Sequence, residues 1–303
     1  MLLTGADGQL GRALVPRLAE RGHVEATTLH GVKGTRKLDL SDLDSLRAVL
    51  DEVRPDLIFN AAAYTAVDRA ETEPDLARAI NAAAPGVMAK WAADHGAGLV
   101  HFSTDYVFDG RKGAPYLEDD PTAPLNEYGA SKLEGEQAVA ASGCRHVILR
   151  TSWVYASQGE NFVLKMLELA RERDSLNVVS DQVGRPTWAG NLARYALAAV
   201  DAGVLEDTDP GARMLHAADA GAQSWFEFAR LVFETAVSLS LLESSPQLRE
   251  VGSDAFPTVA RRPPFSVLGT GRLRQRVGID PLPVRDSLRE CLQELVTPHP
   301  SAP

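Results

Sequence analysis

The sequence predicts an α/β protein built on a doubly wound parallel sheet, with a smaller α/β domain at its C-terminal end. Three observations support this prediction. Short apolar strands alternate with helical segments over the first 150 residues, a glycine-rich turn joins the first strand to the first helix, and the regular alternation weakens after that region. Strands and helices that alternate with short connections are typical of a parallel sheet with helices on both faces.

The glycine-rich turn follows the apolar strand at 1–4 directly. It contains Gly5, Gly8 and Gly11, and it continues into a segment with apolar residues at helical spacing to about Arg21. In a strand–turn–helix unit, such glycines permit a tight turn, a close approach of backbone N–H groups to a pyrophosphate, and packing of the helix on the sheet. The turn therefore predicts a Rossmann-like dinucleotide site. Its spacing differs from the commonest Gly-x-Gly-xx-Gly, and the alternative is a glycine-rich turn that holds no ligand.

The second predicted strand, at 24–29, is not followed by an acidic residue. An enzyme selective for NAD usually has an acid there to bind the ribose 2′-OH. Here the strand leads to His30, Lys33, Arg36 and Lys37. These basic residues favour NADPH, or use of both coenzymes, over strict NADH; the alternative is a solvated loop.

Asp39 precedes the next predicted helix. Asp39 either accepts a hydrogen bond from an adenine amino group or acts as a further helix cap. Ser41 or Asp42 is a suitable N-cap for the helix that follows. The later elements of this part are a helix at 42–53, a strand at 56–59, a long helix at 74–95, a strand at 99–102, a loop at 121–126, a helix with Tyr128, and a strand at 147–149.

Small and polar residues follow the ends of two of these strands. Residues 60–67 read Asn-Ala-Ala-Ala-Tyr-Thr-Ala-Val, and residues 103–106 read Ser-Thr-Asp-Tyr. Ligands of open parallel sheets bind just beyond such strand ends, and alanines leave room for one. The Thr104 hydroxyl is suited to donate a hydrogen bond to a substrate carbonyl. The alternative is a turn residue that bonds its own backbone.

Tyr128 and Lys132 stand four residues apart in a predicted helix, so they share one face. A free phenol has a pKa of about 10, and a neighbouring cation lowers that pKa toward the working range. The pair is therefore suited to proton transfer during interconversion of a carbonyl and an alcohol. The alternative is an amphipathic helix face with a solvated lysine.

Composition excludes several classes of protein. The 303 residues are 45% hydrophobic and 24% charged, as in soluble globular proteins. The net charge of −10 and the lack of a concentrated Lys/Arg run argue against a nucleic-acid binder. Cys144 and Cys291 form no CxxC pair, which favours buried thiols in a reducing cytoplasm. We see no signal peptide and no membrane-spanning apolar run, so we predict a cytoplasmic protein without a membrane partner.

The second half of the chain is less regular. We expect residues 1–150, rejoined by about 188–218, to form a dinucleotide-binding domain, and 151–187 with 219–303 to form mainly a substrate-binding domain. Ser224 and Glu227 predict a capping box. The expected elements are helices at 161–173, 191–200, 224–240 and 284–295, strands at 177–180 and 215–218, a turn at 184–187, lid-like loops at 244–283, and a frayed tail at 297–303.

Six blocks in order along nearly the whole chain carry a family resemblance: 4–11, 60–68, 103–108, 124–129 with Lys132, 150–155 and 260–263. Together they resemble the extended short-chain dehydrogenase/reductase superfamily and, within it, the dTDP-4-dehydrorhamnose reductase family. The resemblance implies that NADPH or NADH gives a hydride to C4 of dTDP-4-dehydro-L-rhamnose. Tyr128 would protonate the oxyanion, Thr104 would polarise it, and Lys132 would tune Tyr128 and bind the nicotinamide ribose.

The resemblance also implies which residues bind the two ligands. The implied cofactor site consists of Gly5, Gly8, Gln9, Leu10, Gly11, Asp39, Leu40, Ala61, Ala62, Ala63, Thr65, Tyr128 and Lys132. The implied contacts with the dTDP-sugar are Val67, Thr104, Asp105, Tyr106 and Trp153, with Arg185, Arg261 and Arg262 as candidates for the diphosphate or nucleotide. For the Arg261/Arg262 pair, a surface ion-pair site is the alternative.

Two departures from the family pattern matter. Some members form a dimer bridged by magnesium bound to acids on two helices, and the corresponding segments here, from Arg12 and from Gly190, lack acids. No metal is therefore predicted, and a homodimer without the metal bridge is left open. The family commonly follows its Arg-Pro with Asn and Ser, whereas this chain has Phe265 and Ser266.

Two alternatives to a reductase stay open. A sugar-nucleotide dehydratase or epimerase would keep its NAD bound, but dehydratases typically place an acid pair after the threonine, and Tyr106 follows Asp105 here. A non-catalytic regulatory subunit could retain the same fold and the same Thr104, Tyr128 and Lys132.

Overall fold

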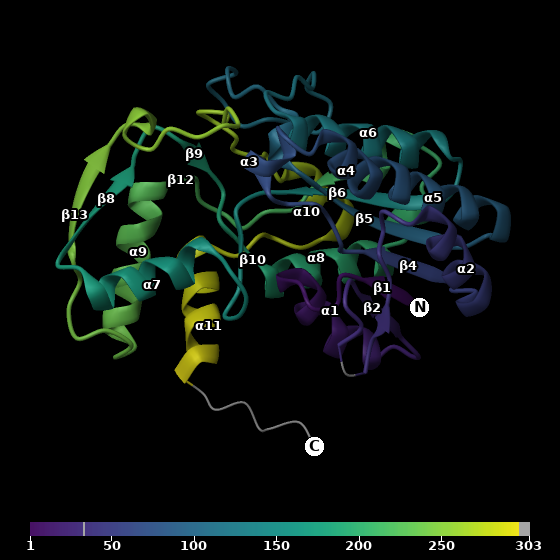
Figure 1. The fold of residues 1–303 in the computed structure, drawn as a ribbon, viewed down its shortest axis with the longest axis horizontal. Coiled ribbons are helices and arrows are strands. Elements are labelled where there is room, and N and C mark those ends of the chain that lie inside the picture. Colours follow the sequence, from purple (N-terminus) through teal and green to yellow (C-terminus); the bar gives the residue numbers. More distant parts are fainter. Residues whose placement is uncertain (33, 297–303) are drawn as a thin grey trace.

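A seven-stranded parallel sheet forms the centre of the larger lobe (Figure 1). The computed structural model describes residues 1–32 and 34–296, so Lys33 and the predicted tail at 297–303 lie outside the described residues. The strands are β1 (Leu2–Thr4), β2 (Glu25–Thr28), β3 (Arg36–Lys37), β4 (Leu57–Asn60), β5 (Gly98–Thr104), β6 (Arg145–Thr151) and β11 (Met214–His216). Their spatial order is β11-β6-β5-β4-β1-β2-β3, and all neighbours are parallel.

The order of the strands creates a crevice at one edge of the sheet. From β1 the chain moves outward through β2 to β3, and it then returns to β4 on the other side of β1. The connections on either side of β1 run in opposite directions, which opens a crevice beyond the carboxyl ends of β1 and β4. The doubly wound sheet predicted from the sequence is confirmed.

Helices cover both faces of this sheet because each has one apolar stripe. On one face, α1 (Gln9–Ala19) and α8 (Ala189–Asp201) share a core that includes Leu14, Leu18 and Tyr195. On the other face, α2 (Leu43–Val53), α5 (Ala84–His95) and α6 (Glu127–Ala141) bury a second apolar core. Side chains cap two of these helices: Asp42 accepts from the Ser45 N–H at 3.0 Å, and Asn126 accepts from the Gly129 N–H at 2.8 Å.

The long helix predicted at 74–95 is interrupted, and this prediction is wrong in detail. α4 (Pro74–Arg78) is followed by a π-helical turn at Ala79–Ala83 before α5 begins. The turn carries Asn81, whose amide accepts from the Tyr64 N–H and donates to the Ser131 hydroxyl, at 2.8 and 3.0 Å. Buried polar groups need such partners, so these contacts account for the wider turn. They join segments distant in the chain, and hydrophobic periodicity does not reveal them.

A smaller lobe lies to one side of the sheet (Figure 1) and has its own apolar core. Its capping box is confirmed, because the Ser224 and Glu227 side chains each accept from the other's backbone N–H. The principal elements of this lobe are α7 (Phe162–Glu172), β8 (Ser175–Val179), α9 (Trp225–Ser238), β13 (Gln247–Val251) and α11 (Val284–Val296). Two short pairs, β7 (Val154–Tyr155) with β10 (Thr187–Trp188) and β9 (Val183–Gly184) with β12 (Gln223–Ser224), complete the strands.

The prediction that 244–283 is only loops is wrong. β13 pairs in parallel with β8, and α10 (Gly271–Val277) buries Leu273 against the main core. β13 is largely exposed and α10 has seven residues, so neither shows clear periodicity. The predicted strand at 215–218 is confirmed as β11, which pairs with β6. The division into two functional domains stays a prediction.

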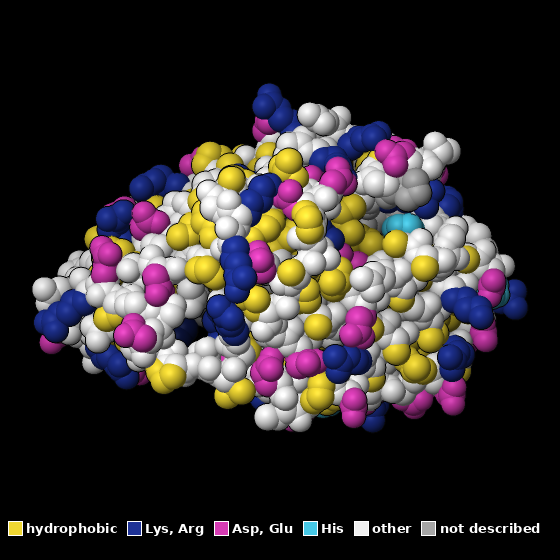
Figure 2. All heavy atoms as spheres, turned by 90° about the horizontal axis from the view of Figure 1, so that it is seen from above, with side chains coloured by type: hydrophobic (Ala, Val, Ile, Leu, Met, Phe, Trp, Pro, Cys, Tyr) yellow, Lys and Arg dark blue, Asp and Glu magenta, His cyan; other side chains and the backbone are white. Residues whose placement is uncertain are grey.

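Within the described residues, no helix combines the length and apolar character needed to cross a membrane. Figure 2 shows a hollow between the smaller lobe and the main body, with Lys and Arg side chains at its edge and hydrophobic side chains gathered beside it.

Candidate active site

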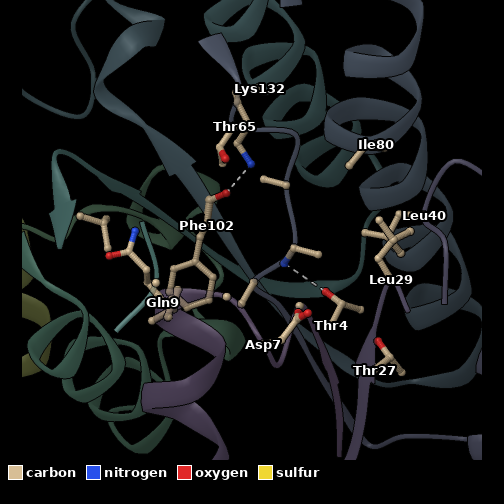
Figure 3. A pocket seen from close by; sticks show the side chains of 18 of the residues that line it. Thr4, Asp7, Gln9, Thr27, Leu29, Leu40, Thr65, Ile80, Phe102 and Lys132 are labelled. Atoms are coloured by element: carbon tan, nitrogen blue, oxygen red, sulfur yellow. Dashed lines mark hydrogen bonds between the residues drawn. The ribbon is translucent and has the colours of Figure 1, made fainter. Parts of the chain in front are cut away.

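A cavity of about 500 Å³ lies at the crevice beyond β1, β4 and β5 (Figure 3). Its wall brings together most of the predicted cofactor residues from four separate segments of the chain. They are Gly5, Gly8, Gln9, Leu10, Asp39, Leu40, Ala61, Ala62, Ala63, Thr65, Tyr128 and Lys132. Gly11, Val67, Thr104, Asp105, Tyr106, Trp153 and the three predicted arginines are not part of this wall.

The cavity also includes residues that the sequence analysis did not single out. Ser103 and Thr151 stand at strand ends, where a search of every strand terminus would have found them. Gly159 and Glu160 come from a loop whose approach to the cavity has no sequence signal. The other additional wall residues are Thr4, Asp7, Thr27, Leu29, Leu38, Ile80, Phe102, Val154 and Leu192.

The glycine turn is close-packed. Gly5 has a φ of +69°, and a Cβ there would lie 2.8 Å from the Ala62 Cα. A Cβ on Gly11 would lie 1.9 Å from the Gly5 carbonyl oxygen. Only glycine satisfies both positions, and the turn brings the N-terminus of α1 to the cavity.

Unpartnered polar atoms also suit this cavity to a polar ligand. The Gln9 Oε1, Ser103 Oγ and Thr151 Oγ1 atoms are buried, line the cavity, and have no hydrogen-bond partner among the described residues. Buried polar groups without partners are uncommon in proteins. With the glycine turn, these residues fit a dinucleotide cofactor.

Replacing Gly11 by Ala should weaken cofactor binding, because the new methyl group would displace the Gly5 backbone. We expect the Kd for NADPH to rise at least about tenfold and the free energy of unfolding to fall by about 1–3 kcal/mol. Fluorescence titration and urea unfolding measure the two effects. Gly271→Ala is the matched control, because a Cβ at Gly271 meets no atom within 4 Å. Unchanged NADPH binding in Gly11→Ala would contradict the proposed pyrophosphate site.

Lys132 and Tyr128 project from α6 toward the end of β5. The Lys132 Nζ donates to the Phe102 carbonyl oxygen at 2.6 Å (Figure 3), and the side chain is buried. Burial lowers the Lys132 pKa to about 8, although the Glu136 carboxylate opposes this shift. The lysine ammonium thus stays the major form at neutral pH.

The expected lowering of the Tyr128 pKa is not what the structure gives. Burial raises this pKa to about 12, the Thr104 hydrogen bond opposes the shift, and the Asp105 charge adds to it. Lys132 is not among the groups that shift this pKa, and its ammonium is bound to the Phe102 carbonyl. Tyr128 is therefore a phenol throughout the physiological pH range.

Thr104 stands at the end of β5 and is buried behind Tyr128. Its hydroxyl donates to Asp105 Oδ1 at 3.0 Å and accepts from the Tyr106 N–H at 3.2 Å. The Tyr106 ring packs edge-on against Tyr128, with centroids 5.8 Å apart. The structure thus brings the predicted Thr104, Asp105, Tyr106 and Tyr128 into one cluster.

Arg262 reaches the rim of this cluster. Its guanidinium pairs with Asp68 at 2.7 Å, and this pair, together with the nearby Tyr106 phenol, raises the Arg262 pKa. Asp68 belongs to the short helix α3 (Val67–Ala70), and Val67 at its start is partly buried. Arg261 is exposed, and its carbonyl accepts from the Asn126 amide at 2.8 Å.

Arg185 and Trp153 are engaged elsewhere. The Arg185 Nη1 donates to the Leu268 carbonyl at 2.6 Å and to Thr270 at 3.1 Å. Trp153 has a φ of +47° and stacks on Trp225, with ring centroids 3.4 Å apart. A Cβ at Gly184 would collide with the indole at 2.5 Å. The tryptophan is therefore fixed by residues of the smaller lobe.

The structure reassigns one of the cations that follow β2. Arg36 pairs with Glu25 at 2.8 Å and with Glu52 at 2.7 Å, so it is not free to meet a 2′-phosphate. His30 and Lys37 are exposed. Asp39 lines the cavity, and its Oδ1 accepts from both the N–H and the hydroxyl of Ser41, which lowers its pKa.

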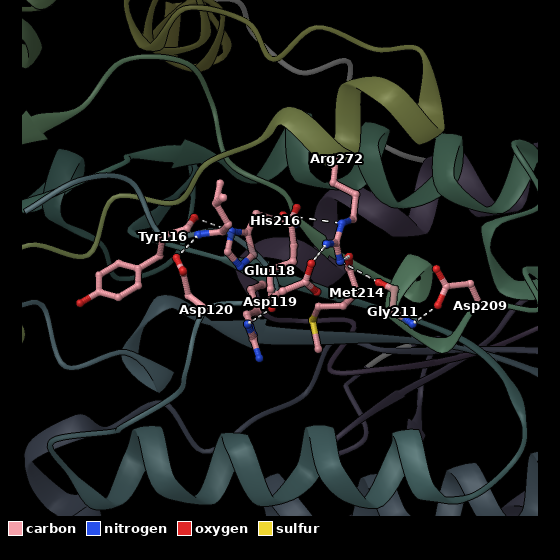
Figure 4. A network of polar contacts seen from close by, with 11 residues as sticks. Tyr116, Glu118, Asp119, Asp120, Asp209, Gly211, Met214, His216 and Arg272 are labelled. Atoms are coloured by element: carbon pink, nitrogen blue, oxygen red, sulfur yellow. Dashed lines mark hydrogen bonds and ion pairs between the residues drawn. The ribbon is translucent and has the colours of Figure 1, made fainter. Parts of the chain in front are cut away.

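A polar network holds the loop that leads to α6 (Figure 4). The His216 N–H donates to Glu118 Oε1 at 3.0 Å, and Arg272 pairs with Glu118 at 3.8 Å and with Asp119. Burial lowers the pKa of His216 to about 3 and raises that of Glu118. The loop is thus joined to β11 and α10, which fixes the approach of the chain to Tyr128.

Among the residues that the structure describes, no group of three or more His, Cys, Asp or Glu side chains is arranged to hold a metal ion.

Known proteins share this architecture. The family profile described as the RmlD substrate binding domain matches residues 1–297. The dTDP-4-dehydrorhamnose reductase of Escherichia coli (strain K12) is 40% identical over 297 residues, which cover 98% of this chain and 98% of that protein. The chain belongs to the dTDP-4-dehydrorhamnose reductase family. The resemblance seen in the sequence is confirmed.

Two further members bear on the ligands of this family. The dTDP-4-dehydrorhamnose reductase of Bacillus anthracis, solved in complex with NADP, superposes with a TM-score of 0.87 and 34% identity, covering 97% of this chain and 98% of its own. A Streptomyces antibioticus protein, named a probable dTDP-4,6-dihydroxy-2-methyloxan-3-one 4-ketoreductase, is 42% identical and covers 99% of this chain and 97% of its own.

Proposed function

We propose that this member of the dTDP-4-dehydrorhamnose reductase family is an NAD(P)H-dependent oxidoreductase that reduces the C4 ketone of dTDP-4-dehydro-L-rhamnose to dTDP-L-rhamnose. The proposal rests on the position of Tyr128 and Lys132 in a cavity opened by a glycine turn, in a chain 40% identical to a reductase of that name. The cofactor, when bound, supplies the hydride. All other steps belong to the protein.

Tyr128 supplies the proton. Hydride addition turns the ketone oxygen into an alkoxide, which is a stronger base than a phenolate. Because the Tyr128 pKa is about 12, the phenol is fully protonated at neutral pH, and its transfer of a proton to the alkoxide is favourable. Lys132 and the Thr104 hydroxyl stabilise the resulting charges by electrostatics and hydrogen bonding. Lys132 would also hold the nicotinamide ribose when the cofactor is bound.

The sugar nucleotide lies beside the Tyr106–Tyr128 pair. The Arg262 guanidinium pairs with Asp68 and keeps 22% of its side chain exposed, so it can meet the nucleotide diphosphate at the rim of the cluster. Trp153, fixed by its stack on Trp225, forms an apolar wall for the sugar. Family position also proposes contacts with the sugar nucleotide for Asp105, Val67, Arg185 and Arg261. The case for Arg185 is the weakest, because this side chain already bonds the 268–270 segment.

NADPH is the favoured coenzyme. No acid stands at the end of β2 to bind a ribose 2′-OH, and the Bacillus anthracis relative was solved with NADP. Exposed His30 and Lys37 lie next to that strand end, although Arg36 is already paired. Use of both coenzymes is compatible with this arrangement.

A second candidate is reduction of a different dTDP-4-keto sugar. The Streptomyces antibioticus relative supports it, since the name of that protein specifies another sugar at similar identity. The chemistry and the catalytic residues are the same for either sugar, and only the contacts around the ring differ.

Supplying the purified protein with dTDP-4-dehydro-L-rhamnose and NADPH, and separately NADH, tests the proposal. We expect stoichiometric loss of NADPH absorbance and formation of dTDP-L-rhamnose, identified by mass and chromatography, with slower turnover of NADH. Oxidation only with another 4-keto sugar would favour the second candidate. NADPH binding without oxidation of any of these substrates would favour a regulatory subunit.

We also propose a cytoplasmic location and leave a homodimer without a bridging metal as the candidate assembly. Cys144 and Cys291 are both buried free thiols, as expected in a reducing compartment.

A further inference from the structure

Asn126 makes one hydrogen bond within its own helix and one to a distant segment. The residue is buried at the N-cap of α6, two positions before Tyr128. Its Oδ1 accepts from the Gly129 N–H, and its Nδ2 donates to the Arg261 carbonyl oxygen, both at 2.8 Å. The first bond is an ordinary helix cap. The second joins residues 135 positions apart and reaches the segment that carries Arg262.

The segment that Asn126 reaches is stiff. Arg262 is followed by Pro263 and Pro264. Prolines have a fixed φ and restrict the residue before them to extended conformations. A Cβ on Gly110 would lie 2.8 Å from atoms of both prolines, so the pair packs closely on that turn. In such a segment, fixing one carbonyl group also fixes where the next side chain leaves the backbone.

Asp68 of α3 makes a second tie to this segment. Its Oδ1 accepts from the Ala260 N–H at 3.0 Å, and its Oδ2 accepts from the Arg262 Nη2 at 2.7 Å. Asp68 therefore holds the guanidinium, while Asn126 holds the backbone beside it. Because α3 packs against α6, both ties fix the segment relative to the helix that carries Tyr128.

The first turn of α6 is itself held in place. A Cβ on Gly129 would lie 2.2 Å from the Tyr106 carbonyl oxygen, so the helix packs directly on the turn that follows β5. A helix end held in this way gives a fixed reference for the segment bonded to it. The separation between Tyr128 and Arg262 is therefore set in part through the Asn126 amide.

That separation matters for a sugar nucleotide. In the proposed function, Tyr128 acts at C4 of the sugar while Arg262 meets the diphosphate attached at C1. Both contacts form together only when the two side chains are the right distance apart.

We propose that Asn126 is a positioning residue for the sugar nucleotide. Its amide holds the Arg262 segment on α6 at the distance that the substrate spans. The inference rests on the roles given to Tyr128 and Arg262 in the proposed function. Asn126 touches neither substrate nor cofactor in this role and acts through the Arg261 carbonyl.

Asn126→Ser separates the two hydrogen bonds. Serine is as good an N-cap as asparagine, so the cap of α6 is kept while the amide donor is lost. We expect the Kd for dTDP, measured by calorimetry, to rise about three- to tenfold, the size of one lost hydrogen bond. KM for the sugar nucleotide should rise by the same factor, with kcat and the Kd for NADPH within about twofold. Unchanged dTDP affinity would overturn the proposal.

Hydrogen exchange tests the tie without any need for activity. In Asn126→Ser, the backbone amides of residues 258–262 should exchange faster, while those of the first turn of α6 keep their protection. Asn126→Ala also removes the cap, so the first turn of α6 should exchange faster as well. If Asn126 were only a helix cap, exchange at 258–262 would be normal in Asn126→Ser, and that result would contradict the proposal.

A double variant tests whether Asn126 acts through Arg262. Arg262→Met alone should weaken dTDP binding, because the guanidinium no longer meets the diphosphate. Adding Asn126→Ser should weaken binding by less than about twofold more, since the side chain that it positions is gone. Fully additive losses would show that Asn126 acts elsewhere and would exclude the proposed role. If the unmodified protein binds NADPH but not dTDP, the proposed function falls together with this inference, which separates that outcome from the others.

Discussion

Tyr128→Phe is expected to lower kcat for reduction of the 4-keto sugar by about 10²–10⁴-fold, the usual contribution of a general acid. The substitution removes the phenolic oxygen and keeps the ring that packs against Tyr106. The Kd for NADPH should change by less than about threefold, because binding depends on the glycine turn and Lys132. Steady-state kinetics and fluorescence titration measure the two quantities.

The control for this prediction is Tyr116→Phe. Tyr116 is also buried, but its hydroxyl bonds Asp109 at 2.8 Å and it does not line the cavity. Its removal should leave kcat within about twofold. Normal turnover in Tyr128→Phe would show that another group gives the proton, and a parallel loss of NADPH binding would indicate a structural effect.

Arg150→Met is expected to lower the free energy of unfolding by about 3–5 kcal/mol, because it leaves Glu136 charged and buried without a partner. Arg150 and Glu136 join through two bonds of 2.6 and 2.8 Å, and their side chains are only 5% and 4% exposed. Arg150 also lies over the Phe108 ring, 5.1 Å from its centroid. Urea unfolding with a common m-value measures the loss.

Two variants make this prediction specific. Lys165→Met removes an exposed pair, with side chains 57% and 55% exposed, and should cost less than about 1 kcal/mol. The double variant Arg150→Met with Glu136→Leu removes both charges and should recover much of the loss. If the double variant is as unstable as the single one, the cost comes from lost packing and not from the unpaired carboxylate.

Arg150 and Glu136 also connect stability to the site. Glu136 stands one helical turn after Lys132 on α6, and Arg150 belongs to β6, which pairs with β5. The ion pair therefore holds the helix that carries Tyr128 and Lys132 against the strand that carries Thr104. Loss of the pair should reduce kcat in addition to stability.

Much of the fold and the cofactor cavity could be predicted because the signals are local. The glycine turn needs no information beyond seven consecutive residues, and the i,i+4 relation of Tyr128 and Lys132 depends only on helix geometry. Alternation of strands and helices predicted the parallel sheet. The elements that were missed, β13 and the π-helical turn at Ala79–Ala83, depend on partners distant in the chain.

The sequence by itself determined the sheet, the glycine turn and the candidate acid–base pair, since each follows from residues close in the chain. Only the tertiary structure decided the ionisation of those groups. Burial raises the pKa of Tyr128 to about 12 and that of Asp105 to about 7, and Arg36 is paired with Glu25 and Glu52. Desolvation and ion pairing depend on the segments that the fold packs around each group, and sequence spacing does not contain that information.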